Sequence, residues 1–312
     1  MSLGFVFPGQ GSQSVGMLAE LATHHEEVQR TFAEASDVLG IDLWTLVQEG
    51  PEEKLNQTVN TQPAMLTAGA AVWRVWRKHD GPVPVWMAGH SLGEYTALAC
   101  AQALSFTDAV GLVADRGRFM QEAVPIGQGS MAAIMGLDDV GVSTLCERCA
   151  DGEVLSPVNF NAPGQVVVAG TTAAVERAVA QAKAAGARRA LMLPVSGPFH
   201  CELMRPAADR MAQRLQSVEI RSPSVPVLHN VHAAAESEPE AIRRALVEQI
   251  RSPVRWVDTV TKMAAAGVGR VIECGPGKVL LGLNRRITRE VDALPVFDTE
   301  TLEHALSVVR EG

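Results

Sequence analysis

The stretch that most constrains the fold of this chain is the elbow, residues 89–93, which reads Gly-His-Ser-Leu-Gly. A short apolar run, 83–88, precedes it, and small helix-forming residues, 96–101, follow it. This order predicts a buried strand, a sharp turn and a helix, which is the setting of a nucleophile elbow. Because glycine has no side chain, the strand and helix can approach closely while the turn exposes the hydroxyl of Ser91.

The same turn predicts roles for the two residues next to Ser91. The backbone N–H of Leu92 lies at the start of the helix, where it can stabilise negative charge above the hydroxyl. We expect His90 to shape the turn, because adjacent side chains at an elbow point apart. A Gly-x-Ser-x-Gly motif also arises by chance in a glycine-rich chain, so the flanking strand and helix patterns carry much of its meaning.

Composition excludes several classes of protein. The 312 residues are 47% apolar and carry a net charge of −8, which argues against nucleic acid or an anionic membrane as the main partner. No uninterrupted apolar segment approaches the length of a membrane span, about 18 residues, and the N-terminus has no signal-like pattern. The five cysteines are odd in number and irregular in spacing, so reduced thiols, a cytoplasmic location and no metal site are expected.

The order of predicted strands and helices indicates two units, one inserted into the other. Over 1–127 and 196–312, strands and helices alternate, which predicts a large, discontinuous α/β-hydrolase-like catalytic domain with a mostly parallel sheet. Residues 128–195 follow the order β-α-β-β-α-β of a ferredoxin-like unit. We predict that this inserted α+β subdomain needs no partner from the rest of the chain.

The helix before the elbow is predicted over 61–79. Thr61 is a favourable N-cap, and Pro63 then falls in the first turn, where proline is tolerated because its missing N–H has no helical partner.

A serine hydroxyl needs a base to become a nucleophile, and the chain has eight histidines. His200 stands out because it follows the return of the inserted unit to the large domain, where a loop would lie over the cleft. A histidine bonded to backbone at a helix start is an equally good interpretation. His229 and His232, near a predicted strand end, stay possible. Cys201 is rejected as a thiol nucleophile, because it would diverge from the adjacent His200.

Motifs along nearly the whole chain resemble, in order, those of the malonyl-CoA:acyl carrier protein transacylases. They are Phe7-Pro8-Gly9-Gln10-Gly11-Ser12-Gln13, Thr61-Gln62-Pro63-Ala64, Gly89-His90-Ser91-Leu92-Gly93-Glu94, Arg116-Gly117, Asn159-x-Asn161-x-Pro163-Gly164-Gln165, Gly197-Pro198-Phe199-His200, Gln249 with Pro253-Val254-Arg255-Trp256, and Glu273-x-Gly275-Pro276-Gly277. Acyltransferase domains of polyketide and fatty-acid synthases, and the acyltransferase subunit of malonate decarboxylase, are similar. This ordered match is far more specific than the elbow alone.

The resemblance implies a serine acyltransferase that moves malonyl from malonyl-CoA to the phosphopantetheine thiol of acyl carrier protein, for fatty acid synthesis, with no bound cofactor. Ser91 would be the nucleophile and His200 its base. A backbone carbonyl near Gln249 would orient the histidine in place of an acid. The backbone N–H groups of Gln10 and Leu92 would form the oxyanion hole.

The resemblance also implies that Arg116 binds the free carboxylate of the malonyl group. A guanidinium makes two parallel hydrogen bonds to a carboxylate, and an unpaired arginine in a closed pocket penalises acetyl substrates. Without the resemblance, Arg116 is an ordinary helix-face arginine. His90 and Asn159 would support the site, and Phe199, beside His200, would restrict substituents at the malonyl α-carbon.

Other functions stay open. A serine esterase or thioesterase of the α/β-hydrolase type needs a late histidine, and only His304 is late. A carrier-docking module with a dead site conflicts with the intact Ser91, His200 and Arg116. The malonyltransferase subunit of malonate decarboxylase and the trans-acyltransferase of a polyketide synthase share this chemistry, and the sequence does not separate them.

The acyl carrier protein is expected to dock transiently on a local basic surface. Carrier proteins are acidic and this chain is acidic too, so a productive encounter needs positive charge at the cleft rim. Arg188 with Arg189, and Arg285 with Arg286, are the candidates. Solvated charges scattered over the surface are the alternative interpretation.

Overall fold

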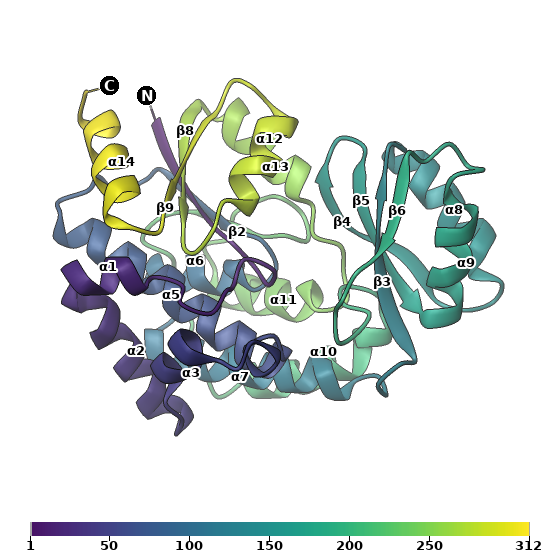
Figure 1. The fold of residues 1–312 in the computed structure, drawn as a ribbon, viewed down its shortest axis with the longest axis horizontal. Helices are drawn as coiled ribbons and strands as arrows, with labels where there is room; N and C mark the ends of the chain where they lie inside the picture. Colours follow the sequence, from purple (N-terminus) through teal and green to yellow (C-terminus); the bar gives the residue numbers. More distant parts are fainter. Residues whose placement is uncertain (1, 312) are drawn as a thin grey trace.

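The computed structural model describes residues 2–311 and contains one parallel and one antiparallel sheet (Figure 1). The parallel sheet has the order β7-β2-β1-β8-β9, and all of its strand pairs are parallel. Its strands are β1 (Ser2–Phe7), β2 (Trp86–Gly89), β7 (Val227–Leu228), β8 (Val268–Cys274) and β9 (Asp292–Val296). The α/β fold predicted for the large domain is confirmed.

Helices surround this sheet. They are α1 (Ala19–His24), α2 (Glu26–Leu39), α3 (Leu43–Glu49), α4 (Glu52–Leu55), α5 (Thr58–Lys78), α6 (Gly93–Cys100), α7 (Phe106–Glu122), η1 (Glu202–Met204), α10 (Arg205–Leu215), α11 (Pro239–Gln249), α12 (Trp256–Ala265), α13 (Val279–Ile287) and α14 (Thr299–Glu311). Within residues 2–311, no helix is both long and apolar enough to cross a membrane.

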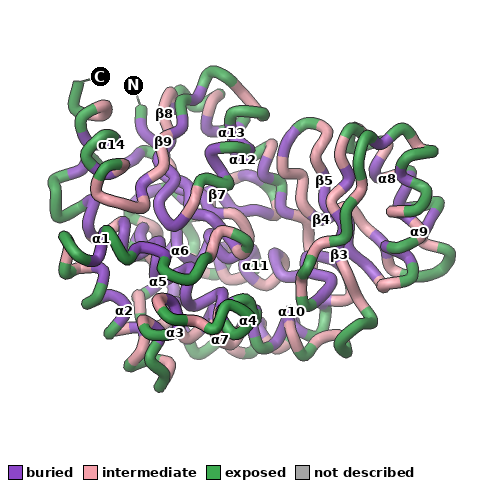
Figure 2. Tube along the Cα trace, in the orientation of Figure 1, coloured by how far each residue is buried: buried purple, intermediate pink, exposed green. Residues whose placement is uncertain are grey.

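Strand β1 shows why the sheet needs cover on both faces. Phe5 and Phe7 belong to the core cluster built with α5, α6 and α7, whereas Val6 packs in the cluster that contains Trp256 of α12 and Leu280 of α13. Successive side chains of a strand point to opposite faces, so an apolar strand is stable only between two layers of helices. Figure 2 shows buried trace through the middle of the molecule and exposed trace on the outer helices.

The antiparallel sheet has the order β4-β5-β3-β6, with strands β3 (Gly129–Met135), β4 (Leu155–Ala162), β5 (Gln165–Thr171) and β6 (Arg189–Met192). Helices α8 (Asp139–Ala150) and α9 (Thr172–Ala182) pack together on its outer side, at the right of Figure 1. Cys146 and Cys149 are buried in the core between these helices and the sheet. The ferredoxin-like order of elements is confirmed, while the boundaries of the two domains stay a prediction.

The inserted unit is hydrogen-bonded to the large unit along β4, and its independence stays a prediction. Strand β4 lies at the edge of its sheet, and the backbone groups along its outer side bond to the segment before α12. The N–H of Phe160 donates to the carbonyl of Val254 at 3.0 Å, and the N–H of Val254 donates to the carbonyl of Val158 at 2.8 Å. Buried edge groups need such partners, and this pairing ties β4 to the large unit.

The predicted start of the helix before the elbow is wrong. Helix α5 begins at Thr58, so Pro63 lies inside it. The hydroxyl of Thr61 does not cap the helix but donates to the carbonyl of Leu55 at 2.6 Å. A proline here leaves the carbonyl of Val59 without its helical N–H donor, a local cost that the surrounding packing overrides.

Candidate active site

Ser91 lies in the sharp turn between β2 and α6, as the elbow pattern predicts. Its φ angle is 51°, in the left-handed region that non-glycine residues rarely adopt. A Cβ atom on Gly89 would lie 1.8 Å from the backbone carbon of Gly93, and one on Gly93 would lie 2.1 Å from the carbonyl oxygen of Phe7. Only glycine fits at these two positions, so the close approach of strand and helix holds Ser91 in its strained conformation.

The hydroxyl of Ser91 contacts a histidine. Ser91 Oγ lies 2.7 Å from His200 Nε2, and His200 Nδ1 lies 2.8 Å from the backbone oxygen of Gln249 at the end of α11. A carbonyl only accepts hydrogen bonds, so Nδ1 carries the hydrogen and Nε2 keeps a free lone pair toward Ser91. The position of His200 after the inserted unit favoured it as the base, and the resemblance added the carbonyl near Gln249.

The protonation state of His200 suits a base. Burial, helped by the nearby guanidinium of Arg116, lowers the pKa of His200 to about 3. The ring is therefore neutral near pH 7 and free to accept a proton from Ser91.

Helix α7 places Arg116 across from Ser91. Its Nη2 lies 3.2 Å from Ser91 Oγ and 2.8 Å from Gln249 Oε1, and its Nη1 lies 2.8 Å from Gln62 Oε1. Arg116 is 1% exposed, and burial lowers its pKa, although a guanidinium stays charged. Among residues 2–311, its hydrogen-bond partners are neutral, and its Nε has none. The buried cation is therefore ready for an anionic ligand.

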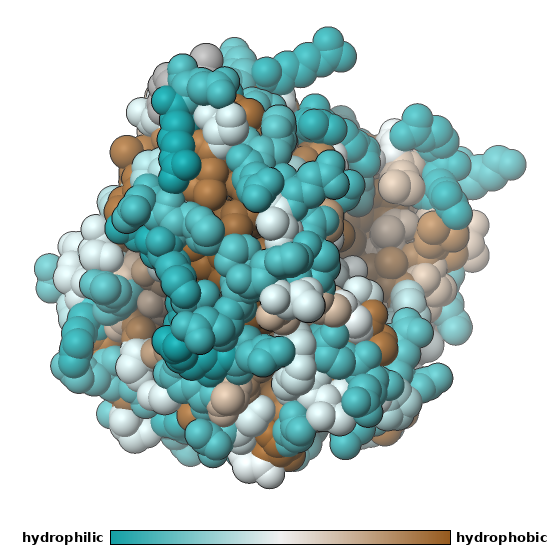
Figure 3. Space-filling view, turned by 60° about the vertical axis from the view of Figure 1, so that its left-hand side comes forward, coloured by the Kyte–Doolittle hydropathy of each residue, from teal (hydrophilic) through white to brown (hydrophobic). Residues whose placement is uncertain are grey.

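A cavity of about 130 Å³, the Ser91 cavity, joins these groups between the two sheets. The predicted residues that line it are Gln10, His90, Ser91, Leu92, Arg116, Asn159, Phe199 and His200. Apolar side chains complete the wall: Met120, Met131, Leu193 and Val195. A larger surface groove, about 770 Å³ between α10 and α11, contains one predicted candidate, His232, which lies away from Ser91 and contacts Glu236. Figure 3 shows a largely hydrophilic face with scattered apolar patches.

His90 does not contact the hydroxyl of Ser91. Its Nε2 lies 2.8 Å from Asn161 Oδ1, and its ring packs 5.6 Å from that of Trp256. Burial lowers the pKa of His90, which keeps the ring neutral. His90 thus joins the elbow to β4 and α12, in line with the turn-shaping role expected for it.

The proposed oxyanion donors lie at two adjacent strand ends. Gln10 follows β1 and Leu92 follows β2, and both line the Ser91 cavity. No side chain caps the start of α6. The side chain of Gln10 contacts Thr58 Oγ1 at 3.3 Å. The backbone N–H groups of Gln10 and Leu92 therefore stay predicted donors to the oxyanion.

Several buried polar residues lie behind Ser91, and His229 is one among them for which the sequence predicted a possible role. His229, kept as a possible base, lies 2.7 Å from Glu94, and neither residue is exposed. Asn230 bonds the backbone of Ser91, and Gln62 bonds Arg116. The sequence did contain two signals for them. Glu94 is a charged residue inside the apolar helix after the elbow, and His229 and Asn230 form a polar pair directly after β7.

The four arginines predicted for carrier docking are all exposed. Arg286 bonds the side chain of Gln165 at the start of β5. Arg188 lies against Gly136, whose N–H donates to the carbonyl of Gly164 at 2.8 Å. Arg286 and Arg188, one from each predicted pair, therefore lie near the turn between β4 and β5.

The known proteins to which this chain is similar point to one family of acyltransferases. Residues 4–300 match the acyl transferase domain family. A malonyl CoA-acyl carrier protein transacylase of Salmonella typhimurium is 57% identical over 303 residues, covering 97% of this chain and 98% of that protein. The Bacillus subtilis protein of the same name is 45% identical over 310 residues, covering 99% and 98%.

Solved structures are similar over the same length. A malonyl-transacylase in complex with its type II PKS acyl-carrier protein has a TM-score of 0.98 and is 55% identical. The match covers 99% of this chain and 100% of that chain. The malonyl CoA-acyl carrier protein transacylase of Coxiella burnetii has a TM-score of 0.97 with 50% identity, covering 98% and 97%.

Proposed function

The chain belongs to the acyl transferase family, and we propose that it transfers malonyl from malonyl-CoA to acyl carrier protein through an ester on Ser91. The product would supply extender units for fatty acid synthesis. The contact of 2.7 Å between Ser91 Oγ and His200 Nε2, beside the buried Arg116, is the observation that supports this mechanism most.

The first half-reaction loads the enzyme. His200 Nε2 takes the proton of Ser91 as Oγ attacks the thioester carbon of malonyl-CoA, and a new C–O bond forms. The C–S bond then breaks, and the departing thiolate of coenzyme A receives the proton from His200. The backbone N–H groups of Gln10 and Leu92 stabilise the oxyanion between the two steps.

The second half-reaction reverses these roles. The phosphopantetheine thiol of the carrier gives its proton to His200, and its sulfur attacks the ester carbon. The C–O bond to Ser91 breaks, and His200 returns the proton to the serine oxygen. No cofactor takes part in either half.

Arg116 selects the acyl group. The malonyl carboxylate gives the buried guanidinium an ionic partner, which an acetyl group lacks. The apolar wall of the Ser91 cavity, with Phe199 near the reacting centre, leaves little room for a substituent on the α-carbon.

The carrier protein docks on the basic surface formed by Arg188, Arg189, Arg285 and Arg286. The positions of Arg188 and Arg286 near the turn between β4 and β5 support one continuous surface. Free thiols at the five cysteines support action in a reducing compartment such as the cytoplasm.

Transfer to a carrier thiol is the test of this function. We expect malonyl-CoA with holo-carrier protein to give malonyl-carrier protein, and the apo-carrier, which lacks the phosphopantetheine thiol, to stay unmodified. Mass spectrometry of the carrier reads out the product. Release of free malonate without carrier modification would indicate a thioesterase instead.

A further inference from the structure

A buried polar cluster that the proposed reaction does not use lies directly behind Ser91. Glu94, His229, Asn230 and Gln249 are each 0% exposed. A buried carboxylate is costly unless its oxygens accept hydrogen bonds, and Glu94 accepts several. Its Oε1 lies 2.7 Å from His229 Nδ1, and its Oε2 accepts from the N–H of Asn230 at 2.8 Å and from Gln249 Nε2 at 2.9 Å.

The two residues held by Oε2 of Glu94 both bond the backbone of the nucleophile. Asn230 Oδ1 accepts from the N–H of Ser91 at 2.7 Å, and Asn230 Nδ2 donates to the carbonyl of Gly89 at 2.7 Å. Gln249 Nε2 donates to the carbonyl of Ser91 at 2.9 Å. These side chains, which we call the Ser91 clamp, hold both peptide groups of a residue whose φ is strained.

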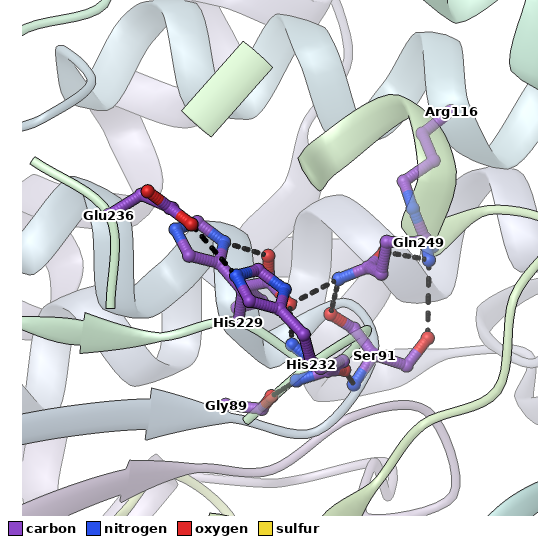
Figure 4. Close-up of polar contacts among 9 residues, drawn as sticks. Gly89, Ser91, Arg116, His229, His232, Glu236 and Gln249 are labelled. Carbon is purple, nitrogen blue, oxygen red and sulfur yellow. Dashed lines mark hydrogen bonds and ion pairs between the residues drawn. The ribbon is translucent and has the colours of Figure 1, made fainter. Parts of the chain in front are cut away.

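Gln249 extends the clamp to the acyl-binding arginine. Its Nε2 faces Ser91 and Glu94, and its Oε1 accepts from Arg116 Nη2 at 2.8 Å. In Figure 4, Gln249 lies between Ser91 and Arg116, with dashed lines to both. A flipped amide would place Nε2 against the guanidinium and Oε1 against a carbonyl, so one orientation is strongly favoured.

We propose that Glu94 is a positioning residue: through Asn230 and Gln249 it holds the backbone of Ser91, and through Gln249 it fixes the guanidinium of Arg116 relative to the serine hydroxyl. This role rests on the proposed function in taking Ser91 as the nucleophile and Arg116 as the residue that binds the malonyl carboxylate. It makes nucleophile geometry and acyl selection depend on one carboxylate that touches neither the substrate nor the reacting atoms.

Two variants separate position from charge. Glu94→Gln keeps the side-chain length: its oxygen can accept from Asn230 and Gln249, while its amide donates to His229 in the other tautomer. Glu94→Asp keeps the charge but is one methylene shorter, so it cannot hold both partners. We expect a fluorophosphonate probe to label Ser91 about 100-fold more slowly in Glu94→Asp, and within about 10-fold of the wild-type rate in Glu94→Gln.

Acyl selection gives a readout that general destabilisation would not move. In Glu94→Asp, malonyl loading should fall about 10-fold further than acetyl loading, because Arg116 loses its fixed partner. Asn230→Ala is the matched control, because it removes one hydrogen-bond partner of the Ser91 backbone but keeps the hydrogen bond between Gln249 and Arg116. The rates of malonyl and acetyl loading should therefore fall by the same factor. Glu273→Gln, at another fully buried carboxylate, should leave the labelling rate per folded molecule unchanged.

Two results would overturn this role for Glu94. One is faster labelling in Glu94→Asp than in Glu94→Gln, which would assign the effect to charge. The other is an equal loss of malonyl and acetyl loading in Glu94→Asp. A wild-type protein that labels quickly with the probe but forms no malonyl ester would refute the proposed function alone, because the probe measures the clamp without malonyl.

Discussion

Two strand–turn–helix junctions lie at the same edge of the parallel sheet, and they use the helix N-terminus in opposite ways. After β8, the carboxylate of Glu273 accepts from the N–H groups of Leu280 and Leu281 at 2.9 and 2.6 Å, which occupies the start of α13. After β2, no side chain caps α6, and Leu92 at its start lines the Ser91 cavity. The first junction is closed, and the second is open to a ligand.

The position of one glutamate in each junction accounts for the difference. Glu273 precedes its turn and reaches forward onto the helix N–H groups, whereas Glu94 follows its turn and reaches back to His229, Asn230 and Gln249. An occupied N–H cannot bind an oxyanion, so only the second arrangement leaves a site for one. A similar local fold therefore stabilises the protein at one junction and serves the reaction at the other.

The largest expected effect comes from breaking the open junction at its base. His200→Ala should slow malonyl loading of Ser91 by about 10³- to 10⁴-fold, because the hydroxyl loses its proton acceptor. In the wild type, the lowered pKa of His200 keeps the ring neutral, so single-turnover loading should stay level from pH 8 down to pH 5. A fall in rate centred near pH 6.5, the ordinary histidine value, would contradict the burial of this ring.

Removing the cation changes the choice of acyl group at the open junction. Arg116→Ala should reduce the preference for malonyl over acetyl by about 100-fold, because malonyl loses an ionic partner and acetyl no longer faces an unpaired guanidinium. Competition between malonyl-CoA and acetyl-CoA measures this ratio. An unchanged preference would place the carboxylate elsewhere.

Breaking the closed junction should affect stability and spare the chemistry. Glu273→Gln should lower the free energy of unfolding by about 1–3 kcal/mol, because one helix N–H loses its acceptor. Denaturant titration measures this change, and loading per folded molecule should match the wild type. Slower loading in the folded variant would mean that the two junctions are coupled.

The cost of Glu273→Gln should also depend on pH. Burial raises the pKa of Glu273 to about 7, so the folded protein binds this proton more tightly than the unfolded chain does. The stabilisation from protonation is complete below about pH 4.5 and is lost as pH rises through about 7. The stability difference between wild type and variant should therefore be larger at pH 5.5 than at pH 8.5, and an equal difference at both would contradict the raised pKa.

The smallest expected effect lies outside both junctions, on the docking surface. Charge reversal at Arg285 and Arg286 should raise the apparent KM for the carrier by about 5- to 10-fold and leave malonyl loading unchanged. Reversal at Arg188 and Arg189 should act in the same way. Rising salt should weaken the wild type more than the variants, because exposed charges are screened. Unchanged carrier kinetics in both reversed pairs would exclude these arginines.

Much of the open junction could be predicted from sequence because its rules are local. The elbow glycines and the strand before them lie within a few residues of Ser91, and the β-α-β-β-α-β order is visible in the pattern alone. The chain position of His200 already favoured it as the base, and the resemblance, now supported by the family match, added Arg116 and Gln249. Their convergence on Ser91 depends on contacts between residues far apart in the chain.

The features that the sequence analysis missed are set by tertiary packing. Helix α5 runs through Pro63 because its surroundings outweigh a local rule. The pairing of β4 with Val254 joins segments about a hundred residues apart. The partners of Glu94 lie 135 or more residues away, so its role was not readable from the motif that contains it.

The central claim is that the open junction carries an acyl group on Ser91 during the reaction. Intact-mass and peptide analysis after mixing with malonyl-CoA tests it most directly. We predict one malonyl adduct per chain, located on Ser91 and lost in Ser91→Ala. An adduct that persists in Ser91→Ala, or that maps to another residue, would contradict the account.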